Sequence, residues 1–195
     1  MRAMIMAALI AIPFTGQALA EEKTAIFAGG CFWCVESDFD KVDGVLSTVS
    51  GYTGGHTENP TYQEVVRETT GHYEAVRITY DSTVVDYRTL ADYFFRHVDP
   101  TDAGGQFCDR GDSYRTAIFA TPEQRADAEA SKAEVEELLT PEIVTPILDA
   151  VTFYDAEDYH QNYYQNNPLR YKLYRYRCGR DARVAEVWAE AGPAS

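Results

Sequence analysis

The sequence has few positive charges: 17 lysines and arginines stand against 31 aspartates and glutamates, giving a formal net charge of −14. A surface this acidic repels phosphate backbones, so we expect no nucleic-acid partner. Internal repeats, linkers and low-complexity blocks are also absent. Apolar residues make up 45% of the 195 residues and charged residues 25%, which is typical of globular proteins and excludes wholesale disorder. The length suits one compact domain.

Long hydrophobic runs are absent beyond the first 20 residues. Residues 1–20 begin with the cation Arg2, continue through the apolar run 3–12, and end in Ala18-Leu19-Ala20. This order predicts a secretory signal peptide cleaved before Glu21, followed by a single domain over residues 21–195. The alternative is an uncleaved anchor, but a run of about a dozen residues is short for a bilayer. No cysteine follows the cleavage site, so a lipoprotein anchor is not supported. We therefore expect a periplasmic or secreted protein with no membrane attachment after cleavage.

Cysteines are few, and their spacing does not suit zinc. Cys31 and Cys34 form a C-x-x-C pair, whereas Cys108 and Cys178 each stand alone. A structural zinc site needs a second close pair of ligands, so we expect no metal. Four cysteines in an exported chain commonly form structural disulfides, and three connectivities are possible. The C-x-x-C spacing is instead typical of redox chemistry.

Hydrophobic periodicity alternates between strand-like and helix-like segments along the chain. Strands are predicted over residues 24–28, 45–52, 73–80, 114–120 and 144–153. Helices are predicted over residues 31–40, 86–98, 121–139, 157–164 and 182–191, with a helical turn at 61–67. Asp86 and Thr121 are the expected N-caps. The pattern predicts one α+β domain with a long loop at 99–113 and a loosely structured C-terminal tail.

Cys31 stands where a predicted strand turns into a predicted helix. Gly29 and Gly30 permit a tight turn, which leaves the thiol at the helix N-terminus. Unpaired N–H groups and the helix dipole favour a thiolate there. Phe32 and Trp33 add flat apolar surface that suits a sulfur-containing group. The alternative is an inert buried cysteine between two core aromatics.

Glu74 is the one acid on the otherwise apolar face of the predicted strand 73–80. Burial at this position favours the neutral carboxylic acid, which is able to donate a proton. The alternative is an exposed charge at the edge of a sheet. The four histidines lack the spacing of metal ligands, so we expect them to make local hydrogen bonds: His56, His72, His97 and His160.

Several motifs of this sequence resemble those of a known family. Gly30-Cys31-Phe32-Trp33 followed by Glu36 is similar to the G-C-F-W-x-x-E signature of the A-class peptide methionine sulfoxide reductases. The likeness continues in order through residues 51–55, 59–62, 71–76, 114–115, 156–161 and 167–168. It thus covers nearly the whole chain after the signal peptide.

The resemblance implies a two-layer α+β sandwich around a ferredoxin-like βαββαβ core. It also implies reduction of the S-epimer of methionine sulfoxide, free or in proteins. We expect a monomer that uses no cofactor and is regenerated by a thioredoxin-like dithiol. The roles that it implies are Cys31 as nucleophile, Glu74 as acid, Tyr62 and Tyr114 as hydrogen-bond donors to the oxygen, Asp109 as a further pocket acid, and Phe32 and Trp33 as the cradle of the methyl group.

Attack by Cys31 leaves a sulfenic acid that a second thiol must resolve. Cys34 occupies a position where glycine is commonest in the family, and it lies one helical turn from Cys31. Cys178, before Gly179, matches the position of a C-terminal resolving cysteine in many relatives. We expect Cys178 to meet Cys31, while a first bond to Cys34, relayed to Cys178, stays open. Cys108 receives no role.

Two other classes compete with this interpretation. An exported thioredoxin-like disulfide oxidoreductase also carries C-x-x-C after a strand, but it needs a Pro-containing loop facing the cysteines that is not evident here. A secreted binding domain with two permanent disulfides is the second alternative.

Overall fold

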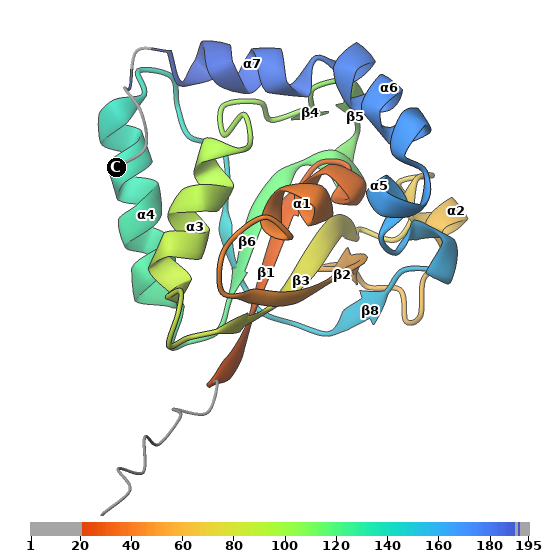
Figure 1. Cartoon of the computed structure of the whole chain (residues 1–195), viewed down its shortest axis with the longest axis horizontal. Coiled ribbons are helices and arrows are strands. Elements are labelled where there is room, and N and C mark those ends of the chain that lie inside the picture. The colour runs from red at the N-terminus through yellow and green to blue at the C-terminus, as the bar shows by residue number, and fades with distance from the viewer. Residues whose placement is uncertain (1–20, 190, 192–195) are drawn as a thin grey trace, which may run out of the picture.

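A computed structural model describes residues 21–189 and Ala191, and its centre is a six-stranded sheet (Figure 1). The strands follow the order β7-β6-β1-β3-β2-β8 across the sheet. They are β1 (Glu22–Gly29), β2 (Val45–Thr53), β3 (Tyr73–Asp81), β6 (Thr116–Ala120), β7 (Ile147–Asp149) and β8 (Phe153–Asp155). The predicted signal peptide, residues 1–20, lies outside the described residues.

Helices follow or precede most of these strands. They are α1 (Phe32–Phe39), α2 (Tyr62–Val65), α3 (Tyr87–Arg96), α4 (Arg125–Leu138), α5 (Tyr163–Asn166), α6 (Pro168–Cys178) and α7 (Arg180–Val187). Two short 3₁₀ turns are η1 (Asp112–Tyr114) and η2 (Asp158–His160). In the part of the chain that the structure describes, every helix is too short or too polar to span a membrane.

The central four strands have the ferredoxin-like connectivity. β3 lies between β1 and β2 and pairs with both in antiparallel fashion, so β1 and β2 run parallel. α1 connects β1 to β2, and α3 connects β3 to β6, which pairs antiparallel with β1. The βαββαβ core that the family resemblance implied is therefore confirmed. β7 and β8 extend the sheet at its two edges.

The main core lies between the sheet and the helices α1 and α3, which cross in front of it in Figure 1. The ring of Phe27 on β1 stacks on Phe39 of α1 at 5.3 Å and on Phe94 of α3 at 5.0 Å between centroids. Strand alternation sends the Phe27 side chain to the face that the two helices cover, and burying one phenylalanine contributes about 1.5–3 kcal/mol. This packing fixes α1, and with it the turn at Cys31, on the end of β1.

Several predicted elements differ in extent. The loop at 99–113 contains the hairpin of β4 (Gly105–Gln106) and β5 (Asp109–Arg110). The predicted strand 144–153 is instead two short strands, β7 and β8, on opposite edges of the sheet. The predicted helix 157–164 is replaced by η2 and α5. α4 begins at Arg125 rather than after Thr121, and residues 121–124 form a turn that leads into it, in which the Gln124 side chain accepts the Thr121 N–H at 3.1 Å.

The C-terminal tail is more ordered than predicted. α6 and α7 form an arm that runs along the β4–β5 hairpin at the upper edge of the molecule in Figure 1. Arg175 of α6 and Arg180 of α7 pair with the buried Asp38 of α1 at 2.8 and 3.5 Å. Sequence periodicity did not reveal this order, because ionic contacts to a distant helix hold the arm and its apolar stripe is weak.

Candidate active site

The turn between β1 and α1 places Cys31 at the helix N-terminus, as predicted. Gly30 adopts a φ of +79°, and a Cβ there would lie 2.5 Å from the Cβ of Gln106. Only glycine satisfies both the left-handed backbone and this close approach. Cys31 is then the N-cap residue of α1, and its side chain is 7% exposed.

A small cavity of about 70 Å³ opens beside the Cys31 thiol. Its lining residues are Cys31, Phe32, Trp33, Tyr62, Glu74, Asp109, Tyr114 and Tyr174. Seven of these eight were predicted from the sequence, although they come from α1, α2, β3, β5 and η1. The fold thus gathers the predicted nucleophile, acids, phenols and aromatic rings in one place.

Glu74 lies on β3 and is 2% exposed, as its position on the apolar strand face predicted. Its Oε2 accepts the Phe32 N–H at 3.1 Å. Burial raises the pKa of Glu74 to about 8, and the nearby carboxylate of Asp109 acts in the same direction. The Glu74 side chain is therefore a neutral acid at pH 7, with a proton to give to a group in the cavity.

Tyr62 and Tyr114 face each other and Glu74 across the cavity. Each phenol lies within hydrogen-bond reach of the other, and Tyr114 also reaches Glu74. Burial raises the pKa of Tyr62 to about 12 and that of Tyr114 further. Both phenols therefore keep their protons and can donate to an oxygen. Glu157 fixes Tyr62 by accepting its backbone N–H at 2.9 Å.

The aromatic wall extends beyond the two predicted rings. Tyr163 stacks on Trp33 with centroids 3.8 Å apart, and His160 accepts the Trp33 indole N–H at 3.1 Å. The ring of Phe32 is 1% exposed and packs against His160 at 4.9 Å. The local hydrogen-bonding role predicted for His160 is confirmed by its bond to the Trp33 indole. Tyr163 and Tyr174 were missed, because nothing in the tyrosine-rich tail marks which rings turn inward.

The thiols of Cys31 and Cys34 are both free and buried. Burial raises the pKa of Cys31 well above that of an ordinary thiol, with further contributions from Cys34, Glu74 and Asp109. The hydrogen bond from Cys31 lowers the pKa of Cys34 to about 7, and Arg180 and Arg175 act in the same direction. The expectation that the helix N-terminus favours a resting thiolate on Cys31 is wrong for this closed site, because burial and nearby acids outweigh the dipole.

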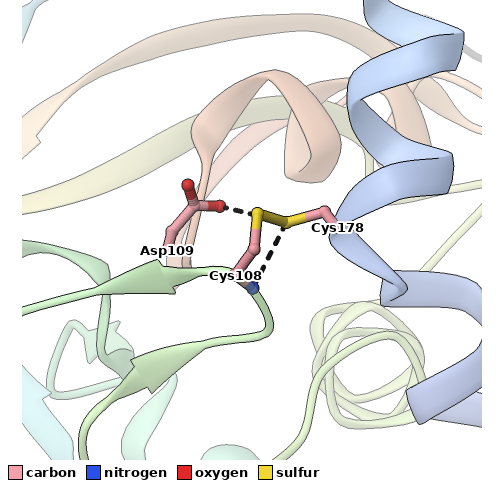
Figure 2. A group of neighbouring side chains, drawn as sticks. All are labelled: Cys108, Asp109 and Cys178. Carbon is pink, nitrogen blue, oxygen red and sulfur yellow. Dashed lines mark hydrogen bonds between the residues drawn. A yellow bond between two sulfur atoms is a disulfide. The ribbon is translucent and has the colours of Figure 1, made fainter.

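Cys178 does not meet Cys31 in this structure. It forms a disulfide with Cys108, with Cα atoms 4.9 Å apart, beside Asp109 (Figure 2). The expected Cys31–Cys178 pairing is therefore not the one observed, and Cys108, which received no role, is a disulfide partner. Cys178 pairs with Cys108 because the tail forms a regular helix, α6, whose end places Cys178 beside the β4–β5 hairpin.

Two cysteines and two histidines outside this cavity are already engaged. Cys108, Asp109 and Cys178 cluster closely, but both sulfurs are in the disulfide and are not free to hold a metal. His72 contacts the Gly55 N–H and the Thr57 carbonyl through its two ring nitrogens, at 3.0 and 2.7 Å. His97 bonds the Tyr93 carbonyl at 2.7 Å. The local roles predicted for these histidines are confirmed.

Comparison with known proteins agrees with this geometry. Residues 23–192 match the sequence profile described as "Peptide methionine sulfoxide reductase". Peptide methionine sulfoxide reductase MsrA 2 of Caulobacter vibrioides is 57% identical over 185 residues, covering 93% of this chain and 94% of that protein.

Solved structures show the same likeness. Methionine sulfoxide reductase A of Corynebacterium diphtheriae aligns with a TM-score of 0.71 and 35% identity, over 76% of each chain. Mxr1 of Saccharomyces cerevisiae, in a structure described as a complex with Trx2, aligns with a TM-score of 0.53 and 26% identity, over 77% of this chain and 90% of that one. This chain therefore belongs to the peptide methionine sulfoxide reductase family of oxidoreductases.

Proposed function

We propose that this protein reduces the S-epimer of methionine sulfoxide, free or within proteins, to methionine. The observation that carries the proposal is the cavity in which one thiol, one neutral carboxylic acid and two phenols converge. A sulfoxide requires this combination, because its oxygen is a poor leaving group until it is hydrogen-bonded and protonated. Family membership supports the substrate class, and the A-class signature supports the epimer.

The first step is attack by the Cys31 sulfur on the sulfoxide sulfur. The Cys31 proton passes to Cys34, whose pKa of about 7 makes it the nearest base. Tyr62 and Tyr114 hold the oxygen, and Glu74 supplies a proton as negative charge develops there. The oxygen moves to Cys31, so methionine leaves and Cys31 becomes a sulfenic acid. The sulfoxide gains two electrons, which Cys31 loses.

Cys34 is the proposed resolving residue. Its thiol lies within hydrogen-bond reach of Cys31 and condenses with the sulfenic acid to give a Cys31–Cys34 disulfide and one water. Cys178 is engaged with Cys108, so it reaches Cys31 only after that bond has been exchanged or reduced. The structure therefore favours Cys34 over the Cys178 pairing expected from the sequence.

A thioredoxin-like dithiol regenerates the enzyme in this proposal. It reduces the Cys31–Cys34 disulfide by exchange and is itself oxidised to a disulfide. The yeast relative described in complex with Trx2 supports a partner of this kind.

The test is turnover of separated epimers of dabsyl-methionine sulfoxide with dithiothreitol. We expect methionine product from the S-epimer alone, and none from a Cys31→Ser variant. Mass spectrometry after one turnover without reductant should show a disulfide between Cys31 and Cys34. Absence of product with the S-epimer contradicts the proposed function, and a Cys31–Cys178 bond after one turnover contradicts the proposed resolving step.

We also propose that the protein is exported. The cationic start, apolar run and A-x-A end of residues 1–20 support a cleaved signal peptide. N-terminal sequencing of protein recovered from a bacterial periplasm should begin at Glu21. Full-length protein retained in the cytoplasm is the contrary result.

A further inference from the structure

Tyr174 is the one residue lining the cavity that the sequence did not predict. It lies on α6, on the helix face that packs against α1 and β5. Its ring meets the Trp33 indole edge-on, with centroids 5.9 Å apart and an angle of 78°. The phenol therefore enters the site from the C-terminal arm, on the side opposite the core sheet.

The Tyr174 hydroxyl has two possible acceptors in the cavity. It donates to Oδ2 of Asp109, and it lines the same small cavity as the Cys31 sulfur, with which it interacts electrostatically. Burial, Cys31 and Asp109 all raise the pKa of Tyr174, so the phenol keeps its proton. One proton thus serves two acceptors, and only one of them can take it at a time.

The position of Tyr174 is fixed by its own helix. Four residues further along α6, Cys178 is bonded to Cys108, and its sulfur lies 3.7 Å from Oδ2 of Asp109 (Figure 2). The residue after Tyr174, Arg175, pairs with Asp38 of α1 at 2.8 Å. α6 is therefore attached both to the hairpin that carries Asp109 and to the helix that carries Cys31.

The cavity offers a Cys31 thiolate no direct cation. None of the described residues that line it is Lys, Arg or His, and Arg175 and Arg180 act on Cys34 instead. The titratable groups around Cys31 are Cys34 from α1, Tyr62 from α2, Glu74 from β3, Asp109 from β5, Tyr114 from η1 and Tyr174 from α6. A charge on Cys31 therefore needs neutral donors around it.

We propose that Tyr174 is a catalytic hydrogen-bond donor to Cys31. While Cys31 is a thiol, the Tyr174 hydroxyl points to Asp109. When Cys31 ionises, the hydroxyl turns and donates to the thiolate, so the phenol changes acceptor and never loses its proton. The C–O bond of a phenol permits this rotation without moving the ring. The inference rests on the proposed function only in taking Cys31 as the nucleophile.

The test compares Tyr174→Phe with Tyr176→Phe, both made in a Cys34→Ser background so that Cys31 is the only free thiol. Tyr176 lies on the same helix but is 84% exposed, which makes it a matched control. The readout is the rate of Cys31 alkylation by iodoacetamide from pH 6 to 10, followed by mass spectrometry. This readout reports ionisation of Cys31 and does not depend on sulfoxide reduction.

We expect Tyr174→Phe to move the alkylation profile upward by about one pH unit and to slow the reaction about tenfold at pH 7. Tyr176→Phe should leave the profile unchanged. Superimposable profiles for Tyr174→Phe and its parent overturn the inference, and so does an equal shift in Tyr176→Phe.

A second variant covers the case in which Tyr174→Phe fails to fold. Replacing Tyr174 by 3,5-difluorotyrosine keeps the ring and makes the hydroxyl a stronger donor. We expect this variant to move the Cys31 alkylation profile downward, and a profile that does not move contradicts the inference. Sulfoxide turnover by the unmodified enzyme is measured in parallel. Failure of that turnover alone counts against the proposed function and leaves the alkylation result to decide on Tyr174.

Discussion

At the scale of single residues, the Cys31 thiol and the Glu74 carboxyl are both buried in one cavity, and burial raises the pKa of each. Strand alternation was enough to predict that Glu74 is buried on an apolar face, and the Gly29-Gly30 turn was enough to predict Cys31 at a helix N-terminus. Burial raises the pKa of Cys31 most, followed by Cys34 and then by Glu74 and Asp109, which lie on separate strands. No local pattern reports such contacts, so the expected resting thiolate was wrong.

The first residue-scale prediction concerns Glu74→Gln. The amide keeps the shape of the carboxyl but has no proton to transfer, so we expect kcat/KM to fall by about two orders of magnitude. In the wild-type enzyme, activity should fall as the pH rises through about 8, where Glu74 ionises. The variant should lack that falling limb. A pH series of initial rates with the S-epimer checks both points, and full activity in the variant rules out the role of proton donor.

The second residue-scale prediction concerns stability. Between pH 4.5 and about 8, Glu74 is ionised in the unfolded chain but neutral in the native one. The unfolded state therefore binds fewer protons, and the wild-type free energy of unfolding should fall with rising pH relative to that of Glu74→Gln. Urea unfolding at pH 5 and pH 8 measures this difference. A constant difference between the two proteins speaks against the raised pKa.

At the scale of elements, the helices and strands of the core were predicted well because their apolar periodicity is strong. Asp86 caps α3 as predicted, accepting the Thr89 N–H at 2.8 Å. The helix predicted at 182–191 corresponds to α7, but α6 and the docking of the arm were not predicted, since they depend on ion pairs to Asp38 and on a disulfide. A hydrophobic pattern reveals a helix by its own apolar face. This arm is held instead by ion pairs to a buried carboxylate of another helix, Asp38 of α1.

An element-scale prediction tests the ionic attachment of α7. Arg180 is 2% exposed and donates to the carbonyls of Gly29 at 3.1 Å and His97 at 2.8 Å, besides pairing with Asp38. Arg180→Met leaves a buried carboxylate with one partner fewer, so we expect a loss of about 3–5 kcal/mol in the free energy of unfolding. Arg177→Met, at an exposed position on α6, should change it by less than about 0.5 kcal/mol. If both variants lowered the free energy of unfolding in urea equally, the ionic attachment of α7 through Arg180 would be contradicted.

The second element-scale prediction concerns the Cys108–Cys178 disulfide. Cys108 and Cys178 are 70 residues apart, so their bond removes much of the unfolded chain's freedom. The double variant Cys108→Ser/Cys178→Ser should be about 2–4 kcal/mol less stable than the oxidised protein in urea. With excess reductant present, the two proteins should unfold together. A variant as stable as the oxidised protein would show that the bond does not hold the arm.

At the scale of the whole molecule, the hydrophobic pattern of the sequence predicted only the fold class, whereas the family resemblance predicted the fold itself. Alternating periodicities indicate an α+β domain, but many strand orders satisfy them, and the ferredoxin-like order β6-β1-β3-β2 came from the resemblance. All seven predicted lining residues of the cavity meet because that order brings β1, β3 and the β4–β5 hairpin to one end of the sheet.

The net charge of −14 leads to a prediction for the whole molecule. Copies with this charge repel each other at low ionic strength, so we expect a monomer. Light scattering coupled to gel filtration should give a mass below the 21.9 kDa of the full chain, consistent with one processed copy. A mass of twice that value would contradict the prediction.

The narrowness of the cavity has a consequence for what the enzyme recognises. About 70 Å³ holds the oxidised tip of a side chain and little of the backbone behind it. Whether an oxidised methionine can react then depends on how far its side chain projects from the surface of the substrate protein. We therefore expect oxidised methionines on exposed or unfolded segments of a protein to be better substrates than those buried in a folded interior.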